Sequence, residues 1–358
     1  MSKAHQLNER QQDVLKATVH HYVATAEPVG SKTLAQEYNF KVSSATIRNA
    51  MGRLEKAGLL YQPHTSAGRI PSDSGYRIYV DRLMIPNEVW ARQVEQIYTT
   101  QLEGMGYSFE SFFQSAAQLL ATISGQIALI TLPQNIHNIL HHLQLIQVNE
   151  KQVMLIVVTD TYQTQSVLMN LPKALEATGN AQLIDDELQL LSNFLNHKLQ
   201  GKSLSTLAQL DWVELDREFA CYTDFLKKLL KELTRRAELP ASSPILIRGI
   251  SEVLRQPEFC QLQQVQTLLH LLEEEQDQLL PMVFELPELD AIQKRVTVRI
   301  GAENKLEPLS TCALITANYH HRDVPVGSVG VIGPTRMIYE NAIAMVEATA
   351  DYISATLS

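Results

Sequence analysis

Residues 43–58 most constrain what this chain can fold into. Four apolar residues recur there at three- and four-residue spacing and predict one buried helical stripe: Ile47, Ala50, Met51 and Leu54. Ser43 or Ser44 can cap the first turn, and Gly58 suits the position just past the helix end. The opposite face carries amides, hydroxyls, small residues and cations, without a carboxylate. Such a face is typical of the second helix of a helix-turn-helix, which enters the major groove of DNA.

The flanking segments complete a small domain. Residues 7–25 and 31–39 have the pattern of two amphipathic helices that precede this one. Residues 59–61 read as a strand, 62–68 as a polar turn and 69–71 as a basic second strand, which together predict a β-hairpin wing. A helical pair with a hairpin that only packs is the alternative, and the local cations and carboxylate-free face argue against it. We therefore predict a winged helix-turn-helix, followed by an exit helix in which Arg77 and Arg82 either contact phosphates or are solvated surface charges.

The charge is distributed unevenly along the 358 residues. The whole chain has a formal net charge of −9, which by itself argues against a nucleic-acid partner. Residues 1–85, however, carry +4 and the remainder carries −13. A basic module on an acidic body fits a DNA reader whose body is repelled by phosphate.

Other features exclude several classes of protein. The cysteines, Cys221, Cys260 and Cys312, have no zinc-finger or redox spacing, which favours a reducing compartment. We find no signal core and no run long enough to span a membrane, so we expect a cytoplasmic protein without a membrane partner. The glycines of 327–333 lack the order of a dinucleotide fold and the lysine of a P-loop. We expect no enzyme, no cofactor and no metal.

The body of the chain combines helices and short apolar strands. A strongly apolar helix ending near Ile123 either covers a sheet or pairs with its copy in a dimer. Strands follow within 127–171 and again within 296–332, which predicts one α+β sheet domain interrupted by a mostly helical insertion. The boundaries we expect are 1–86 for the DNA-binding domain, 87–180 with 286–358 for the sheet domain, and 181–285 for the insertion.

Several motifs resemble one known family. They are PVGSKTLAQ, VSSATIRNAMGRLEKAGLL, QPHTSAGRIPSDSGYRIYVD, VRIGAEN and GVIGPTRMIYENAI. In this order they are similar to the heat-inducible transcription repressor HrcA family of bacteria, from about Arg10 to the C-terminal helix. The resemblance implies a winged helix, a GAF-like domain and an inserted dimerising domain, in agreement with the interruption that the pattern predicts.

The resemblance also implies a function. Members bind an inverted-repeat operator upstream of chaperone operons as homodimers, repress at normal temperature, and are inactivated by heat. A GroEL-type chaperonin helps to restore their DNA-binding form. The alternative is a winged-helix repressor that senses a small molecule through its GAF-like domain, although the strands there are filled with Val, Ile and Leu and offer few convergent polar groups.

The residues expected to contact DNA lie in the helix and the wing. By position in the family motifs they are Ser44, Thr46, Arg48, Asn49, Arg53, His64, Thr65, Ser66 and Arg69. Of Arg48 and Arg53, we expect one to read a base and the other to hold a phosphate, without deciding which. Asn49 suits adenine, and Arg69 is expected in or beside the minor groove.

Overall fold

The structure is a computed structural model that describes most of the chain. The described residues are 7–38, 40–65, 67–102, 109–133, 139–159, 164–172, 175, 181–203, 222, 224–229, 231, 245–259, 261–284, 295–322 and 324–357. They fall into two compact units, unit 1 (Met1–Leu132 with Pro244–Ser358) and unit 2 (Pro133–Ser243). Within the described ranges, no helix has both the length and the apolarity needed to cross a membrane.

Unit 1 begins with three helices around one core. They are α1 (Glu9–Thr25), α2 (Ser31–Glu37) and α3 (Ser44–Lys56). At the start of α1, Asn8 and Gln11 each accept a hydrogen bond from the other's backbone N–H, at 2.9 and 3.0 Å. At the start of α3, Ser43 Oγ accepts from Thr46 N at 3.3 Å. The stripe predicted for this helix is confirmed, because all four residues are buried: Ile47, Ala50, Met51 and Leu54.

A small hairpin follows α3. Its strands β1 (Leu60–Tyr61) and β2 (Ile70–Pro71) pair antiparallel. Val29, in the link between α1 and α2, pairs with Arg69 through hydrogen bonds of 3.0 and 2.9 Å in the two directions. Gly68 lies so close to Val29 that an added Cβ would stand 2.4 Å from its backbone, so only glycine fits there. The base of the hairpin is therefore joined to the α1–α2 link.

The chain then leaves this region through α4 (Asp73–Ile78) and a π-helical turn, η1 (Tyr79–Leu83). We call residues 7–84 the N-terminal module and the rest of unit 1 the core. Near its end the module widens from α- to π-helical geometry, with Met84 N donating to Tyr79 O at 3.0 Å.

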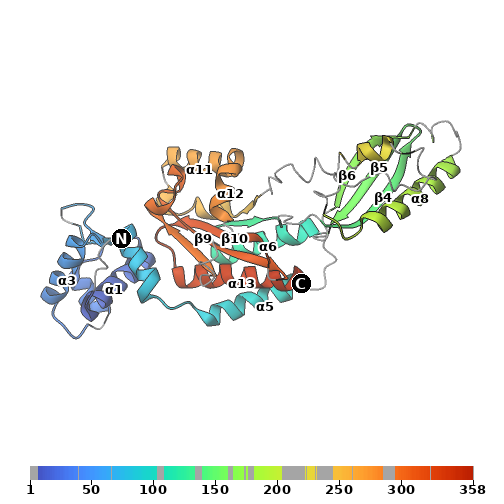
Figure 1. The fold of residues 1–358 in the computed structure, drawn as a ribbon. Helices are drawn as coiled ribbons and strands as arrows, with labels where there is room; N and C mark the ends of the chain where they lie inside the picture. The colour runs from blue at the N-terminus through green and yellow to red at the C-terminus, as the bar shows by residue number, and fades with distance from the viewer. Residues whose placement is uncertain are drawn as a thin grey trace. The chain divides into compact units, whose positions relative to one another are not determined.

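The core is built on a five-stranded antiparallel sheet in the order β7-β3-β10-β9-β8. The strands are β3 (Ile127–Thr131), β7 (Ile245–Arg248), β8 (Val296–Ile300), β9 (Cys312–His321) and β10 (Val324–Pro334). One face is covered by α6 (Phe109–Ser124) and α13 (Tyr339–Leu357), with α5 (Glu88–Leu102) against α13. The other face is covered by α12 (Gln276–Val283), with α11 (Leu262–Glu274) beside it, as Figure 1 shows. Every residue of β3 is buried because both faces are covered.

Short helical pieces complete the core. They are α10 (Ile250–Val253), η5 (Pro257–Phe259), η6 (Gly301–Glu303) and η7 (Glu307–Leu309). The apolar helix before the sheet was predicted either to cover the sheet or to pair with its copy. In the structure, α6 packs on β3 and β7 and buries Phe113 and Leu120. α6 therefore covers the sheet.

Unit 2 contains an antiparallel meander of β4 (Leu140–Asn149), β5 (Gln152–Thr159) and β6 (Thr164–Asn170), with helix α8 (Ala181–Leu199). Side chains of α8 hydrogen-bond the free edge of β4. Leu143 N donates to Asn196 Oδ1 at 2.7 Å, and Leu145 N donates to Ser192 Oγ at 2.9 Å. Leucines of α8 cover the inner face of the sheet and form a core of their own. These backbone groups of the β4 edge are thus satisfied within the unit.

The α+β class is confirmed, but the predicted single sheet is wrong. The strands within 140–170 form their own sheet in unit 2, while β3 pairs with the late strands. The predicted insertion of 181–285 is also displaced, because the inserted unit is Pro133–Ser243 and β7 returns beside β3. Runs of Val, Ile and Leu predict strands, but the pairing of distant strands leaves no local signal in a sequence.

Candidate nucleic-acid interface

The outer face of α3 presents the predicted helix residues. Arg48, Asn49 and Arg53 are exposed, whereas Ser44 and Thr46 are half-buried at the first turn. Among the described residues, neither arginine takes part in an ion pair, so both guanidinium groups are available to a ligand. A row of two unpaired arginines and an amide, on a helix whose other face packs on α1 and α2, can contact base edges and phosphates.

The loop of the hairpin is held in shape by one side chain. Gln62 Nε2 donates to the backbone oxygens of Thr65 and Ala67, at 3.0 and 2.8 Å. His64 and Thr65 are exposed at the tip, as the prediction requires of DNA contacts. The predicted contact Ser66 lies outside the described residues. The described part of the loop is therefore ordered by its own hydrogen bonds.

Arg69 is placed differently from the other predicted contacts. Its Nε and Nη2 both donate to Glu55 Oε2 on α3, at 3.0 and 2.7 Å. Only 20% of the Arg69 side chain is exposed, against 34% for that of Glu55. Sequence reasoning identified the cation but not the carboxylate that binds it.

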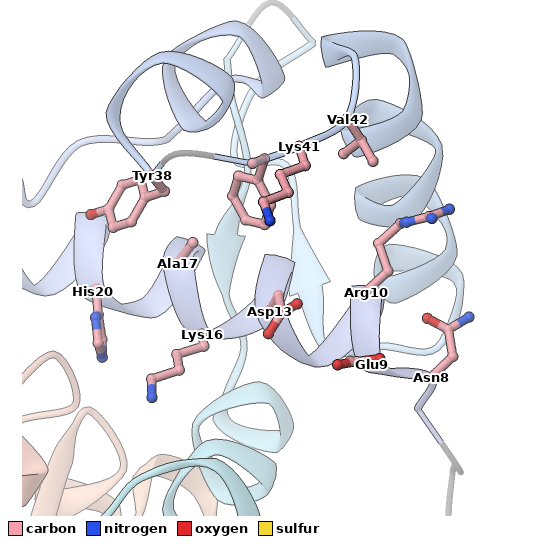
Figure 2. A pocket seen from close by; sticks show the side chains of 11 residues that line it. Asn8, Glu9, Arg10, Asp13, Lys16, Ala17, His20, Tyr38, Lys41 and Val42 are labelled. Carbon is pink, nitrogen blue, oxygen red and sulfur yellow. The ribbon is translucent and has the colours of Figure 1, made fainter.

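A groove of about 730 Å³ lies beside the start of α3, between α1 and the α2–α3 link. Figure 2 shows Arg10 and Val42 at one end and His20 with Tyr38 at the other. Cations and carboxylates both line it: Glu9, Arg10, Asp13, Lys16 and Lys41. This mixture of charge matches neither a purely anionic nor a purely cationic ligand, so the groove does not identify one.

The core sheet offers little support for the small-molecule alternative. Ile127, Leu129 and Leu314 face α11 and α12 in one apolar cluster, while Ile130 and Val331 face the helices of the other side. The space under this part of the sheet is therefore filled by side chains, as the composition of the strands predicted.

Arg77 joins the N-terminal module to the core. Its Nε donates to Glu303 Oε1 at 2.8 Å, its Nη2 donates to the other carboxylate oxygen, and Nη2 also donates to Val298 O at 2.6 Å. Burial alone would raise the pKa of Glu303, but the hydrogen bonds from Arg77 and from Ile300 N lower it below its usual value. Asp73 adds a second contact by accepting from the backbone N–H of η6. Of the two roles predicted for Arg77, neither holds, because its guanidinium is bound within the protein.

A second polar cluster lies a turn further along. The Tyr79 hydroxyl donates to Glu340, and His20 Nε2 lies 2.7 Å from the same hydroxyl oxygen. Burial, together with this hydrogen bond, raises the pKa of Tyr79 far above its usual value, so the hydroxyl remains a donor. Burial would raise the pKa of Glu340 as well, but the hydrogen bonds from His20 and Tyr79 lower it overall.

A third contact starts from the core. Arg336 Nη1 donates to Val23 O, near the end of α1, at 3.1 Å, and the same guanidinium pairs with Glu258. We call the three contacts, centred on Arg77, Tyr79 and Arg336, the module–core junction. Arg77, Glu303, Arg336 and Glu340 of this junction lie in the last three sequence motifs shared with the family. Because these motifs are far apart along the chain, the sequence alone did not indicate that they are in contact.

Comparison with known proteins gives the relatives of the chain. Residues 110–343 match the family described as HrcA protein C terminal domain. The heat-inducible transcription repressor HrcA of Nostoc punctiforme is 57% identical, over 99% of this chain and 98% of its own. The proteins of that name from Nodularia spumigena and Synechocystis sp. are 58% and 48% identical, over 99% and 100% of each chain. A crystal structure of a hypothetical protein at 2.2 Å resolution shares the fold, with a TM-score of 0.61 at 23% identity, over 98% of this chain and 100% of that one.

These relatives define the class: transcription regulators that act as repressors, and not enzymes. More narrowly, the chain belongs to the HrcA family of heat-inducible transcription repressors. The predicted family is therefore confirmed. The prediction that the chain is not an enzyme is confirmed by its family, independently of what the structure contains.

Proposed function

We propose that the chain represses chaperone operons by binding an inverted-repeat operator, with the N-terminal module acting as a winged helix-turn-helix. The observation that carries the proposal is the outer face of α3, where Arg48, Asn49 and Arg53 are exposed together. The names of the relatives support repression under control of heat. The positive charge of the first 85 residues supports DNA as the ligand.

Each predicted residue takes a role that its exposure allows. Asn49 pairs with adenine, and Arg48 and Arg53 divide between a base and a phosphate. Ser44 and Thr46, at the first turn of α3, donate to the phosphate backbone. At the tip of the wing, three residues reach the flanking duplex: His64, Thr65 and Ser66.

Operator binding tests this assignment. The full chain is titrated against its own upstream DNA and against a scrambled repeat, at fixed salt. Asn49→Ala should weaken binding by about 5- to 150-fold and relax the sequence preference, and Arg53→Ala should do the same if Arg53 reads a base, or weaken binding to all sequences alike if it holds a phosphate. Arg255→Ala, which removes an equally charged and 77% exposed side chain from the core, should leave affinity unchanged. Equal affinity of wild type and both α3 variants would contradict the assignment.

We propose further that unit 2 forms a homodimer through the outer face of its sheet. Ile146 lies opposite Met154, which lies opposite Leu168, so that three apolar residues form one row across the strands. Ile146 and Leu168 are 41% and 51% exposed, and Val148 adds a further 49% exposed neighbour. An open apolar face of this kind on a charged chain fits a second copy of itself. Two modules would then read half-sites separated by about 10–10.5 bp or a multiple of it.

Leu168→Glu tests the dimer. It should shift the mass measured by light scattering from dimer to monomer and weaken operator binding. Leu190→Glu is the matched control, because Leu190 is 55% exposed on α8. A monomeric Leu190→Glu protein with a dimeric Leu168→Glu protein would place the contact on the helix instead of the sheet.

We propose that the core is a GAF-like domain whose folding depends on a chaperonin. Its sheet joins β3, β7 and the late strands across long sequence separations, which makes assembly slow and exposes apolar surface on the way. We propose that a GroEL-type chaperonin in the cytoplasm restores the folded repressor after heating. The measurement is operator binding after heating and cooling, with and without chaperonin. Full recovery without chaperonin would contradict this part of the proposal.

A further inference from the structure

The wing is attached to the rest of the module at two independent places, and both involve Arg69. Its backbone N–H donates to Val29 O at 2.9 Å, and its carbonyl accepts from Val29 N at 3.0 Å. Its side chain donates twice to Glu55 Oε2. The strand pair thus fixes the backbone of Arg69, and the ion pair with Glu55 fixes its side chain, so that turning the guanidinium toward DNA would break the ion pair.

We propose that Glu55 is a positioning residue that holds the wing, through Arg69, in the orientation that DNA binding requires. Glu55 is the only carboxylate within Ser44–Lys56, the helix whose outer face meets DNA in the proposed function. The Glu55–Arg69 pair thus fixes the hairpin to α3 and neutralises a negative charge beside phosphates. Arg69 acts inside the protein, and the wing contacts DNA through its tip.

The geometry favours this role over a direct contact with DNA. Both hydrogen bonds are charge-assisted and the pair is largely shielded from solvent, so releasing the guanidinium would leave a half-buried carboxylate without its partner. Gln62 orders the loop from within, by binding two of its backbone oxygens. The loop, the strand pair and the ion pair together make a wing whose shape is set before DNA arrives, which lowers the entropy lost on binding.

The two roles of Arg69 predict opposite effects when Glu55 is changed. If Arg69 contacts DNA, Glu55→Gln frees the guanidinium and removes a negative charge, so affinity rises. If Glu55 positions the wing, Glu55→Gln and Glu55→Ala lower affinity, by about 3- and 10-fold, because the wing must be ordered during binding. This inference rests on the proposed function, so a readout without DNA is needed as well.

The experiment combines operator titration with hydrogen exchange of the free full-length protein. We expect faster hydrogen exchange of the Arg69 amide in both Glu55 variants. In hydroxyl-radical footprinting of the operator, we expect these variants to lose protection of the DNA only at the flank that the wing covers. The double variant Glu55→Arg with Arg69→Glu should recover most of the affinity that Arg69→Glu alone loses. Far-UV circular dichroism checks that each variant is folded. If Glu55→Ala does not fold, the comparison uses Glu55→Gln alone.

Tighter operator binding by Glu55→Gln would overturn the proposal, and so would unchanged exchange of the Arg69 amide. If wild type does not distinguish operator from scrambled DNA, the proposed function fails. The exchange measurement still decides whether Glu55 orders the wing.

Discussion

Replacing Arg77 by alanine should loosen the N-terminal module from the core. The change removes two hydrogen bonds to the Glu303 carboxylate, one to the carbonyl of Val298 and one, of 3.3 Å, to Asp81 Oδ1. It leaves Glu303 with a hydrogen bond from Ile300 N at 2.9 Å, so the carboxylate keeps one donor. The loss is therefore that of the pair with Glu303, of one carbonyl partner and of the exposed i,i+4 pair with Asp81, which contributes only about 0.3–0.5 kcal/mol.

The magnitude follows from exposure. Hydrogen bonds to charged groups contribute about 1.5–3 kcal/mol when buried. Here 26% of the Arg77 and 38% of the Glu303 side chain are exposed, so solvent screening reduces the pair to about 1 kcal/mol. The carbonyl of Val298 adds about 1 kcal/mol. We expect Arg77→Ala to lower the free energy of unfolding by about 2 kcal/mol, and the melting temperature by about 4–8 °C.

The assay is chemical denaturation of the full chain beside a matched variant. Arg82→Ala removes an exposed arginine from the neighbouring π-helical turn η1, and among the described residues Arg82 has no ion pair, so it should change stability by less than about 0.5 kcal/mol. The salt dependence of operator binding gives a second test, because a lost phosphate contact reduces its slope by about one. Equal stability of the two variants, or a reduced slope for Arg77→Ala alone, would refute the reasoning.

Three further predictions concern the same unit. Gly75→Ala should lower the free energy of unfolding by about 2 kcal/mol or more, because the added Cβ would stand 2.1 Å from the backbone oxygen of Leu59. Gly52→Ala, where the added Cβ meets open space, should raise the free energy of unfolding by about 0.5–1 kcal/mol, and chemical denaturation measures both. The lowered pKa of Glu303 adds stability that is complete above about pH 4.5 and is lost as pH falls through the folded pKa, so acid melts should destabilise wild type more than Arg77→Ala. Burial raises the pKa of Cys312 to about 11, so in a variant without Cys221 and Cys260 its thiol should react with thiol reagents at pH 8 only when the protein unfolds.

Local patterns made the N-terminal module predictable. The stripe of α3 repeats with helical spacing, and the serine before it and the glycine after it mark its ends. The exposure of Arg48, Asn49 and Arg53 follows directly from that stripe, because a helix buries one face. These features depend on residues that are close together in the chain.

Long-range contacts were not predictable in the same way. Arg69 and Arg77 have the same appearance in the sequence as Arg53, but their carboxylate partners come from another element, and Glu303 is 226 residues away. The sheet of unit 2 was assigned wrongly because Met154 and Ile156 on its outer face are apolar like its inner face. The alternation that marks a strand with one open face is therefore hidden.

The join between the two units has a consequence for how this chain can be cut. Thr131, the last residue of β3, lies opposite Ile245, the first residue of β7, and the whole of unit 2 connects these neighbours. In topological terms the inserted unit is the loop of one enlarged hairpin. A short turn in its place would close the same two strands without breaking a ladder. Unit 2 is thus an insertion whose removal leaves the core sheet continuous, and a chain without it would test whether the proposed operator binding depends on the proposed dimer contact.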